Sequence, residues 1–157
     1  MTVRQSPQVI VGVERTPSGR AALRVAVAEA VRRGVPLHAI SVRPFLYGPV
    51  DDFRTIDAAF VEAMGGLPDR VEVRRAILEP PVANALTGRA HHPGDVLVLG
   101  APDRSPRRWW HRIWSRSTVR ACLRRARCPI MIVAARDESD PLEEAVGAWS
   151  ASLGPRL

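Results

Sequence analysis

The residues best placed for chemistry lie in the last third of the chain. The apolar run Val96–Leu99 stops at Gly100, as expected for a strand that is covered on both faces. The basic stretch 101–116 follows as a loop, and the hydroxyl of Ser117 or Thr118 is then expected to cap a helix. The first turn of a helix offers free N–H groups and the positive end of the helix dipole, which hold phosphate in many folds. The pattern therefore predicts an anion site at the start of this helix.

The loop before that helix mixes arginines with aromatic residues. Its side chains include Arg104, Arg107, Arg108, Arg112, Arg116, Trp109, Trp110, His111 and Trp114. Arginines bind phosphate oxygens and aromatic rings stack on bases, so the segment Arg104–Arg116 can contact nucleic acid, an acidic partner or a membrane surface. The tryptophans can equally pack onto the domain as a lid, with arginines stacked on them. All 23 basic residues are arginine, which a GC-rich genome also explains, so arginine content alone indicates little.

The elements that must position these residues alternate along the chain. Apolar runs predict five strands, and amphipathic or capped segments predict four helices between them. The expected strands are Val9–Val13, Pro36–Val42, Val71–Leu78, Val96–Leu99 and Ile130–Val133. The first expected helix is Ser18–Arg33, with Ser18 as its N-cap and Gly34 as its C-terminal stop. The other three are expected from about Asp51 to Gly65, from Val82 to about Ala90, and from Ser117 onward. Such alternation predicts a parallel sheet with helices on both faces.

The order of the strands determines where a ligand would bind. Right-handed crossovers put the first strand in the middle of the sheet. The second and third strands then lie on one side of the first strand and the fourth and fifth on the other, so the switch point falls between the first and fourth strands. Open α/β sheets bind ligands at the carboxyl ends of such strands. The turn Glu14–Thr16 and the segment Gly100–Thr118 are expected to meet there.

Both segments resemble the universal stress protein family. The likeness rests on Val9–Gly12 followed by Thr16–Ser18 at one end, and on Ser117–Val119 followed by the Cys128–Val133 strand at the other. It covers roughly residues 7 to 135. The resemblance implies an open, mostly parallel five-stranded sheet in the order 3-2-1-4-5, of the adenine nucleotide alpha-hydrolase-like, Rossmann-like class. The domain is expected to cover residues 1–136. From Asp137 the residue pattern itself changes to an acidic tail, 137–157, in which Leu142, Ala145, Val146 and Trp149 can form one face of a short helix; packing on the domain, packing on a partner and disorder all stay open for this tail.

The resemblance also implies a set of binding residues. In nucleotide-binding members an acidic residue after the first strand bonds the nucleoside, an apolar residue ending the second strand contacts the base, and a Gly-x2-Gly-x9-Gly-Ser/Thr loop wraps the phosphates. Transferred to this chain, the ligand is ATP or another adenine nucleotide, with no metal beyond the Mg²⁺ that accompanies it. The implied binding residues are Glu14, Thr16, Val42, Gly100, Asp103, Ser117, Thr118 and Val119.

The phosphate loop departs from that pattern. Asp103 and Ser117 stand where the second and third glycines belong, and the gap between them is four residues longer than the pattern. Glycines let the backbone approach phosphates, whereas a carboxylate repels them. The arginines nearby can hold an anion with side chains instead.

Several other functions are excluded or disfavoured. With no lysine, neither Schiff-base nor P-loop chemistry is available, and no nucleophile–base motif occurs. His91, His92 and His111 lack zinc-ligand spacing. Cys122 and Cys128 are expected to be buried thiols rather than a disulfide or redox pair. No apolar run is long enough to span a membrane, and no signal peptide is evident, so a cytoplasmic protein is expected.

Two main functional hypotheses remain, together with a third that is weaker. The first is a non-catalytic stress-response protein with a nucleotide site between the first and fourth strands, dimeric through the edge strand Ile130–Val133, because a bare apolar edge invites pairing. The second is an interaction module without nucleotide binding that uses Arg104–Arg116. A nucleotide-hydrolysing enzyme is the third and weakest.

Overall fold

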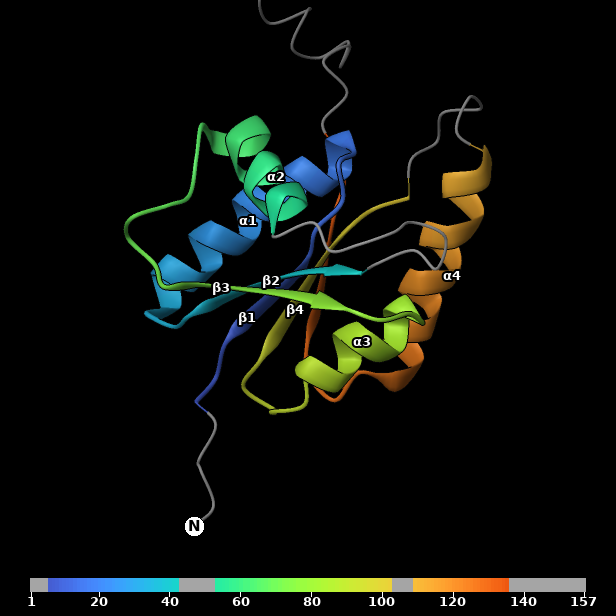
Figure 1. Ribbon diagram of the computed structural model, residues 1–157. Helices are drawn as coiled ribbons and strands as arrows, with labels where there is room; N and C mark the ends of the chain where they lie inside the picture. Colours follow the sequence, from blue (N-terminus) through green and yellow to red (C-terminus); the bar gives the residue numbers. More distant parts are fainter. Residues whose placement is uncertain (1–5, 43–52, 103–108, 136–157) are drawn as a thin grey trace, which may run out of the picture.

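The computed structural model describes residues 6–42, 53–102 and 109–135, of which 109–116 are described by their backbone alone. In this part of the chain, strands and helices alternate from end to end (Figure 1). The elements are β1 Val9–Gly12, α1 Pro17–Arg33, β2 Leu37–Val42, α2 Arg54–Met64, β3 Val73–Leu78, α3 Val82–Arg89, β4 Val96–Gly100, α4 Trp109–Arg125 and β5 Ile130–Val133. The acidic tail 137–157 lies outside the described residues.

The sheet has the expected topology. Its strands pair in the order β3-β2-β1-β4-β5, and all four pairings are parallel. Both the parallel sheet and the order are therefore confirmed. The predicted edge positions of the third and fifth strands are confirmed as well. β1 lies in the centre, and β4 is its neighbour on the side away from β2, which puts the predicted switch point between β1 and β4.

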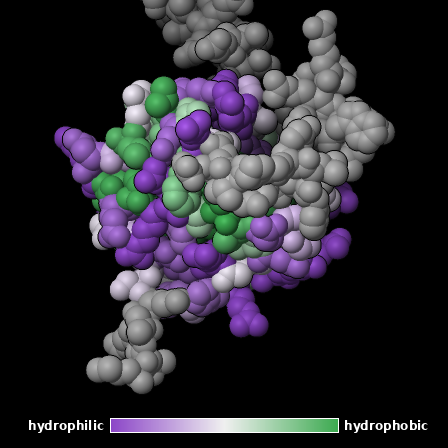
Figure 2. All heavy atoms as spheres, in the orientation of Figure 1, coloured by the Kyte–Doolittle hydropathy of each residue, from purple (hydrophilic) through white to green (hydrophobic). Residues whose placement is uncertain are grey.

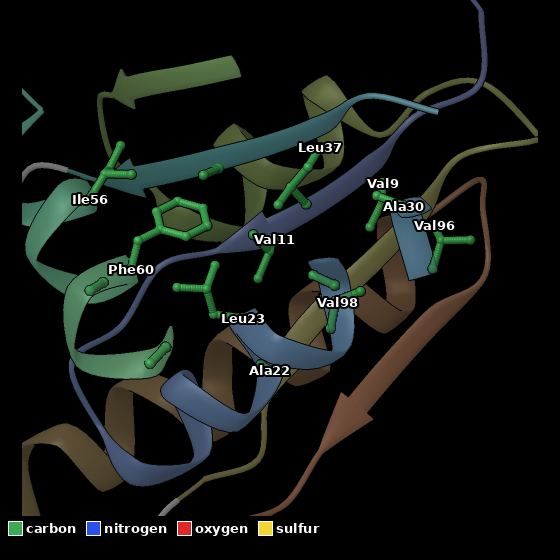
Figure 3. Packing of buried hydrophobic residues seen from close by; sticks show 14 residues of the cluster. Val9, Val11, Ala22, Leu23, Ala30, Leu37, Ile56, Phe60, Val96 and Val98 are labelled. Carbon is green, nitrogen blue, oxygen red and sulfur yellow. The ribbon is translucent and has the colours of Figure 1, made fainter. Parts of the chain in front are cut away.

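Helices cover both faces of the sheet, and each face has its own core. On one face α1 and α2 pack against alternate residues of β1, β2 and β4; Phe60 of α2 lies over the sheet near Val11 and Leu23 (Figure 3). On the other face α3 and α4 pack against the intervening residues, among them Ile10, Ile40 and Leu97. The core strands are apolar on both sides because both faces are covered.

Close packing explains the glycine in β1. A Cβ on Gly12 would lie 3.3 Å from a methyl carbon of Leu86 on α3. A side chain here would push the Leu86 side chain aside by a few tenths of an ångström, so the glycine lets α3 pack closely on the centre of the sheet.

The first helix begins slightly earlier than predicted. Ser18 is not its N-cap. Thr16 holds that position, and its Oγ1 accepts a hydrogen bond from the Gly19 N–H at 3.0 Å. Pro17 follows at the first helical position, where its fixed φ suits the helix and its missing N–H costs nothing. Gly34 ends the helix with φ of 65°, as predicted.

The second helix begins later than predicted. It starts at Arg54, and not near Asp51, with Phe53 as its N-cap residue at a left-handed φ of 57°. Gly65 ends it at φ 84°, as expected from its freedom to adopt that conformation.

The largest correction concerns the last helix. The sequence predicted a loop to Arg116 and a helix start at Ser117 or Thr118, whereas α4 already begins at Trp109. Between Trp109 and Arg125 there is no glycine or proline, so nothing stops the helix from continuing toward its N-terminus. A glycine at the position of Ser117 would have cost about 1 kcal/mol in a helix interior. Serine at this position is compatible with a helix interior, so α4 runs through it without a break.

Candidate functional site

The turn after β1 and the end of β4 do meet, as predicted. Ser18, in the first turn of α1, donates a hydrogen bond from Oγ to the carbonyl oxygen of Ala101 at 2.7 Å. The two residues are 83 positions apart in the chain. This bond joins the start of α1 to the segment leaving β4 at the carboxyl end of the sheet.

Two glycines allow the approach of these segments. A Cβ on Gly100 would lie 2.9 Å from the Gly19 nitrogen, and a Cβ on Gly19 would lie 2.2 Å from the carbonyl oxygen of Glu14. Both contacts are with backbone atoms, which cannot move aside as a flexible side chain could. The glycine at position 100 thus serves the packing of β4 against α1. The sequence singled it out as part of a phosphate loop.

The N-terminus of α1 has already used most of its hydrogen-bond donors. Pro17 has no N–H, the Gly19 N–H bonds the Thr16 hydroxyl, and the Arg20 N–H bonds the Thr16 carbonyl at 2.9 Å. Thr16 Oγ1 also lies 3.3 Å from Ser18 Oγ. An anion at this helix end would find few donors left, so Thr16 acts here as a cap for the helix.

The predicted hydroxyl residues lie within α4 and not at its start. Ser117 and Thr118 come two turns after Trp109, so their backbone N–H groups belong to the helix interior. They therefore do not form the predicted anion site at a helix N-terminus. Ser117 is exposed, and Thr118 is half-buried. Val119 packs against the core on the α3 and α4 face.

Of the remaining predicted residues, Glu14 and Val42 lie at the carboxyl ends of β1 and β2. Glu14 is exposed on the turn after β1, and its backbone carbonyl packs over Gly19. Val42, at the carboxyl end of β2, is half-buried against the same core as Val119. An apolar residue therefore does end β2 on the face that α4 covers. Asp103 lies outside the described residues.

A charged cluster next to the site was missed by the sequence reading. Arg15 pairs with Glu62 of α2 through its Nη2 and its Nε, the latter at 3.1 Å, and Arg20 approaches the same carboxylate at 3.9 Å. The hydrogen bond from Arg15 lowers the pKa of Glu62. Arg24 donates to the carbonyl of Ala63 at 2.6 Å. The cluster joins α2 to α1, and no local pattern could have paired residues 47 positions apart.

Buried polar groups concentrate at the opposite end of the sheet. Asp95, which precedes β4, is 1% exposed and accepts hydrogen bonds from the N–H groups of Gln8 at 3.0 Å and His92 at 2.9 Å. His38, near the start of β2, is 7% exposed, and its Nδ1 has no partner among the described residues. Burial, followed by the charges of Arg89 and Arg74, lowers the pKa of His38.

Both cysteine thiols have a raised pKa, which disfavours the reactive thiolate form. Cys122 is buried in the core, and burial raises its pKa to about 11. Cys128 is half-buried, and burial, followed by the charge of Asp95, raises its pKa as well. Protonated thiols are poor nucleophiles and poor metal ligands. Both are free thiols, as predicted.

Within residues 6–42, 53–102 and 109–135, no group of three or more His, Cys, Asp or Glu side chains is arranged to hold a metal ion. Across the same ranges, none of the helices combines the length and the apolar character needed to cross a membrane.

The chain shares its sequence pattern and fold with known proteins. Residues 7–134 match the model of the Universal stress protein family. A universal stress protein from Archaeoglobus fulgidus has a similar structure, with a TM-score of 0.56 and 19% identity over 82% of this chain and 99% of that one. No curated protein sequence matches the chain.

Two further similar structures contain a ligand. One is a universal stress protein in complex with cAMP, with a TM-score of 0.57 and 19% identity over 82% of this chain and 98% of that one. The other is the Archaeoglobus fulgidus protein in complex with dAMP, with a TM-score of 0.52 and 18% identity over 82% of this chain and 98% of that one. At such identities the likeness establishes the fold.

Proposed function

Because the chain belongs to the universal stress protein family, we propose that it is a non-catalytic stress-response protein that binds an adenine nucleotide at the carboxyl ends of β1 and β4. The observation that carries the proposal is the joining of the β1–α1 turn to the end of β4 through Ser18 and Ala101. Open α/β sheets bind their ligands at this switch point. Two proteins of the same fold are in complex with cAMP and dAMP.

The ligand proposed is a nucleotide with one phosphate rather than ATP. A triphosphate needs a long cradle of backbone N–H groups, which a glycine-rich loop supplies. Here α4 extends back to Trp109, and the first turn of α1 has few donors to offer. A single phosphate needs fewer contacts, and arginine side chains can supply them. Val42 would lie against the base, and Glu14 would bond the ribose.

Calorimetric titration with AMP, adenosine, GMP and Mg-ATP tests this proposal. AMP is expected to bind more tightly than adenosine and GMP, and Mg-ATP no more tightly than AMP. Glu14→Gln should weaken AMP about tenfold, because a hydrogen bond to a charged group contributes about 1.5–3 kcal/mol. Glu72→Gln, at the opposite end of the sheet, serves as the matched control. Absence of heat with every adenine compound would reject the site, and hydrolysis of ATP would reject the non-catalytic role.

We also propose that the protein is a homodimer paired through β5. This strand forms one edge of the sheet and carries Met131 at 36% and Ile132 at 46% exposure. An apolar edge with free backbone groups is suited to pairing with a copy of itself, which also removes an aggregation hazard. Light scattering should give the mass of a dimer at micromolar concentration, and the mass of a monomer would contradict the proposal.

A second candidate function is an interaction module that binds single-stranded nucleic acid through the segment Arg104–Arg116. The observation that favours it is that residues 109–116 are helical, with Trp110 and Trp114 one turn apart. Binding should weaken steeply with salt and fall on replacement of Trp110 and Trp114 by alanine. Phe53→Ala, far from α4 in the sequence, is the aromatic control. This function requires no response to AMP, so the two candidates are separable.

A further inference from the structure

An apolar strip lies along the outer edge of the domain where α4 meets β5. Leu123 on α4 is 55% exposed, and Ile132 on β5 is 46% exposed. Scattered single apolar residues are common on protein surfaces, but neighbouring ones mark contact sites. Figure 2 shows one face of the molecule, on which the described surface is mostly hydrophilic with separate hydrophobic areas at the left and near the centre. The exposure of Leu123 and Ile132 on neighbouring elements therefore calls for a partner that covers them.

The register of the sheet puts Ile132 on the same face as α4. Ile132 pairs with Leu99, and Leu99 belongs to the core that α3 and α4 cover. Met131 pairs with Val98 and faces the α1 side instead. Of the two exposed β5 residues, Ile132 is therefore the one that lies next to α4.

The direction of α4 turns Leu123 toward β5. α4 joins two parallel strands by a right-handed crossover, so it runs antiparallel to them, with α3 on one flank and the β5 edge on the other. Cys122 is fully buried and points to the sheet. The next residue is rotated by about 100° in a right-handed helix. This rotation turns Leu123 to the β5 flank, whereas Ala121 turns to the α3 flank, where it packs against the core.

Positive charge borders the strip. Arg120, Arg124 and Arg127 are all exposed around Leu123. Among the described residues, none of the three has an ion pair or a hydrogen-bonded side chain, whereas arginines on α1 and β3 are paired with Glu29, Glu62 and Asp57. An unpaired arginine cluster around apolar side chains fits a partner that is acidic and amphipathic.

We propose that the C-terminal segment of the same chain, residues 137–149, covers this strip. The chain leaves β5 at Val133 beside the strip, and 22 residues follow from Arg136. The segment has five acids and no base between Asp137 and Glu144, opposite in sign to the three arginines. Its apolar residues fall at helical spacing, as required to lay one apolar face on the strip: Leu142, Ala145, Val146 and Trp149.

Charge favours this occupant over a second copy of the domain. A copy seated on the strip would bring its own Arg120 and Arg124, and like charges repel. The acidic segment neutralises the cluster and buries Leu123 and Ile132. It is also tethered next to the site, so its effective concentration is high. The β5 backbone edge itself stays open to pairing, because the segment lies on the α4 face of the strand.

Charge reversal with rescue in the full-length protein tests this docking. Arg120→Glu with Arg124→Glu should repel the segment and speed chymotrypsin cleavage at Trp149 by about tenfold. Glu143→Arg with Glu144→Arg should do the same, and all four substitutions together should restore slow cleavage. Amide hydrogen exchange over residues 119–125 should rise and fall in parallel. Arg54→Glu with Arg70→Glu, exposed arginines elsewhere, is the matched control and should leave cleavage unchanged.

Three outcomes would overturn the proposal. One is cleavage that is unaffected by reversal of Arg120 and Arg124. Another is failure of the fourfold variant to restore protection while circular dichroism shows it folded. The third is protection that rises with protein concentration, since the segment would then cover a neighbouring chain. Leu123→Ser adds an uncharged check and should speed cleavage without changing the net charge.

Discussion

At one edge of the sheet, β3 presents two arginines that partners hold in place; at the other, β5 presents isoleucine and methionine. Arg75 pairs with Asp57 at 2.8 Å, and its guanidinium lies 5.0 Å from the ring centre of Phe53. Arg74 pairs with Glu72 at 2.8 Å. Within the described residues, no charged side chain belongs to β5. Charged edges resist strand addition, and bare apolar edges accept it.

On each edge strand, one isoleucine has its backbone N–H and C=O groups pointing away from the sheet, where substitution can test whether the edge pairs. The carbonyls of Pro129 and Val133 accept hydrogen bonds from the N–H groups of Leu97 and Ala101 at 3.0 and 2.7 Å, so the backbone groups of Ile132 point away from the sheet. On the other edge Glu72 accepts a bond from Leu37 at 2.9 Å, so the groups of Ile77 point outward. The two isoleucines occupy equivalent outward positions, one on an edge proposed to pair and one on an edge guarded by arginine.

The largest effect is expected from proline at these two positions. Ile132→Pro removes an outward N–H and blocks a partner strand without breaking the pairing with β4. Losing two edge hydrogen bonds and an apolar contact amounts to about 3 kcal/mol, or roughly 100-fold in the dimer dissociation constant. Light scattering across a concentration series measures it. Ile77→Pro is the control on the opposite edge. Equal effects of the two variants would contradict the contrast between the edges.

Removing the arginines from the β3 edge should make it behave like β5. The double variant Arg74→Val, Arg75→Val places two β-branched residues on an edge strand and is expected to raise self-association beyond a dimer by about tenfold. Sedimentation velocity detects the larger species. Arg54→Val with Arg70→Val changes the net charge equally but leaves β3 intact. Association of this control to the same extent would show that net charge, not the edge, is responsible.

Acid should destabilise the β3 side more than the β5 side. His38 lies on β2 next to Arg74 of β3, and burial followed by the charges of Arg89 and Arg74 lowers its pKa. The unfolded chain therefore binds a proton first, near pH 6.5, and folding stability falls as pH drops below that value. On the β5 side the pKa of Cys122 is raised to about 11, so stability falls only above about pH 9.

Urea unfolding at pH 5.5 and 7.5 measures the acid effect. His38→Leu should flatten the difference between the two pH values, because it removes the titrating group. His91→Leu, an exposed histidine that bonds the Gly88 carbonyl, should not. If both variants keep the wild-type difference, His38 is not its source.

The smallest effect is expected from the ion pair that holds Arg75. Asp57→Asn should lower stability by about 0.5 kcal/mol, because both side chains are partly exposed and such pairs contribute little. Thermal unfolding in low and high salt measures it, and high salt should erase the difference. Asp69→Asn, an exposed acid in the loop before β3, is the matched control. A loss above 2 kcal/mol would show that Arg75 depends on Asp57 far more than an exposed pair should.

Much of the fold could be predicted from local patterns. The apolar runs located all five strands to within two residues, because a buried parallel strand needs apolar residues on both faces. Gly34 and Gly65 were predicted to end helices and do so, since both adopt a left-handed conformation. The strand order followed from the handedness of crossovers and the family resemblance.

The candidate site was predicted less well, because its geometry depends on contacts between distant residues. The sequence singled out Gly100 but could not show that the backbone of Ser18 and Gly19 lies against it. It expected Ser18 to cap α1, whereas Thr16 does so and Ser18 is free to bond Ala101. It placed the start of α4 at Ser117 or Thr118 because a hydroxyl there can cap a helix, whereas α4 begins at Trp109.

The sequence by itself determined the class of the protein and the layout of its sheet, because periodicity, turn residues and crossover handedness act over short stretches of chain. Tertiary structure decided which donors are left at the carboxyl end of the sheet. It also decided that the β3 edge carries arginines held in ion pairs, and that Arg120, Arg124 and Arg127 have no ion pair among the described residues. Those outcomes depend on residues far apart in the chain, such as Arg15 with Glu62 and Ser18 with Ala101, and only folding brings these residues within hydrogen-bond distance.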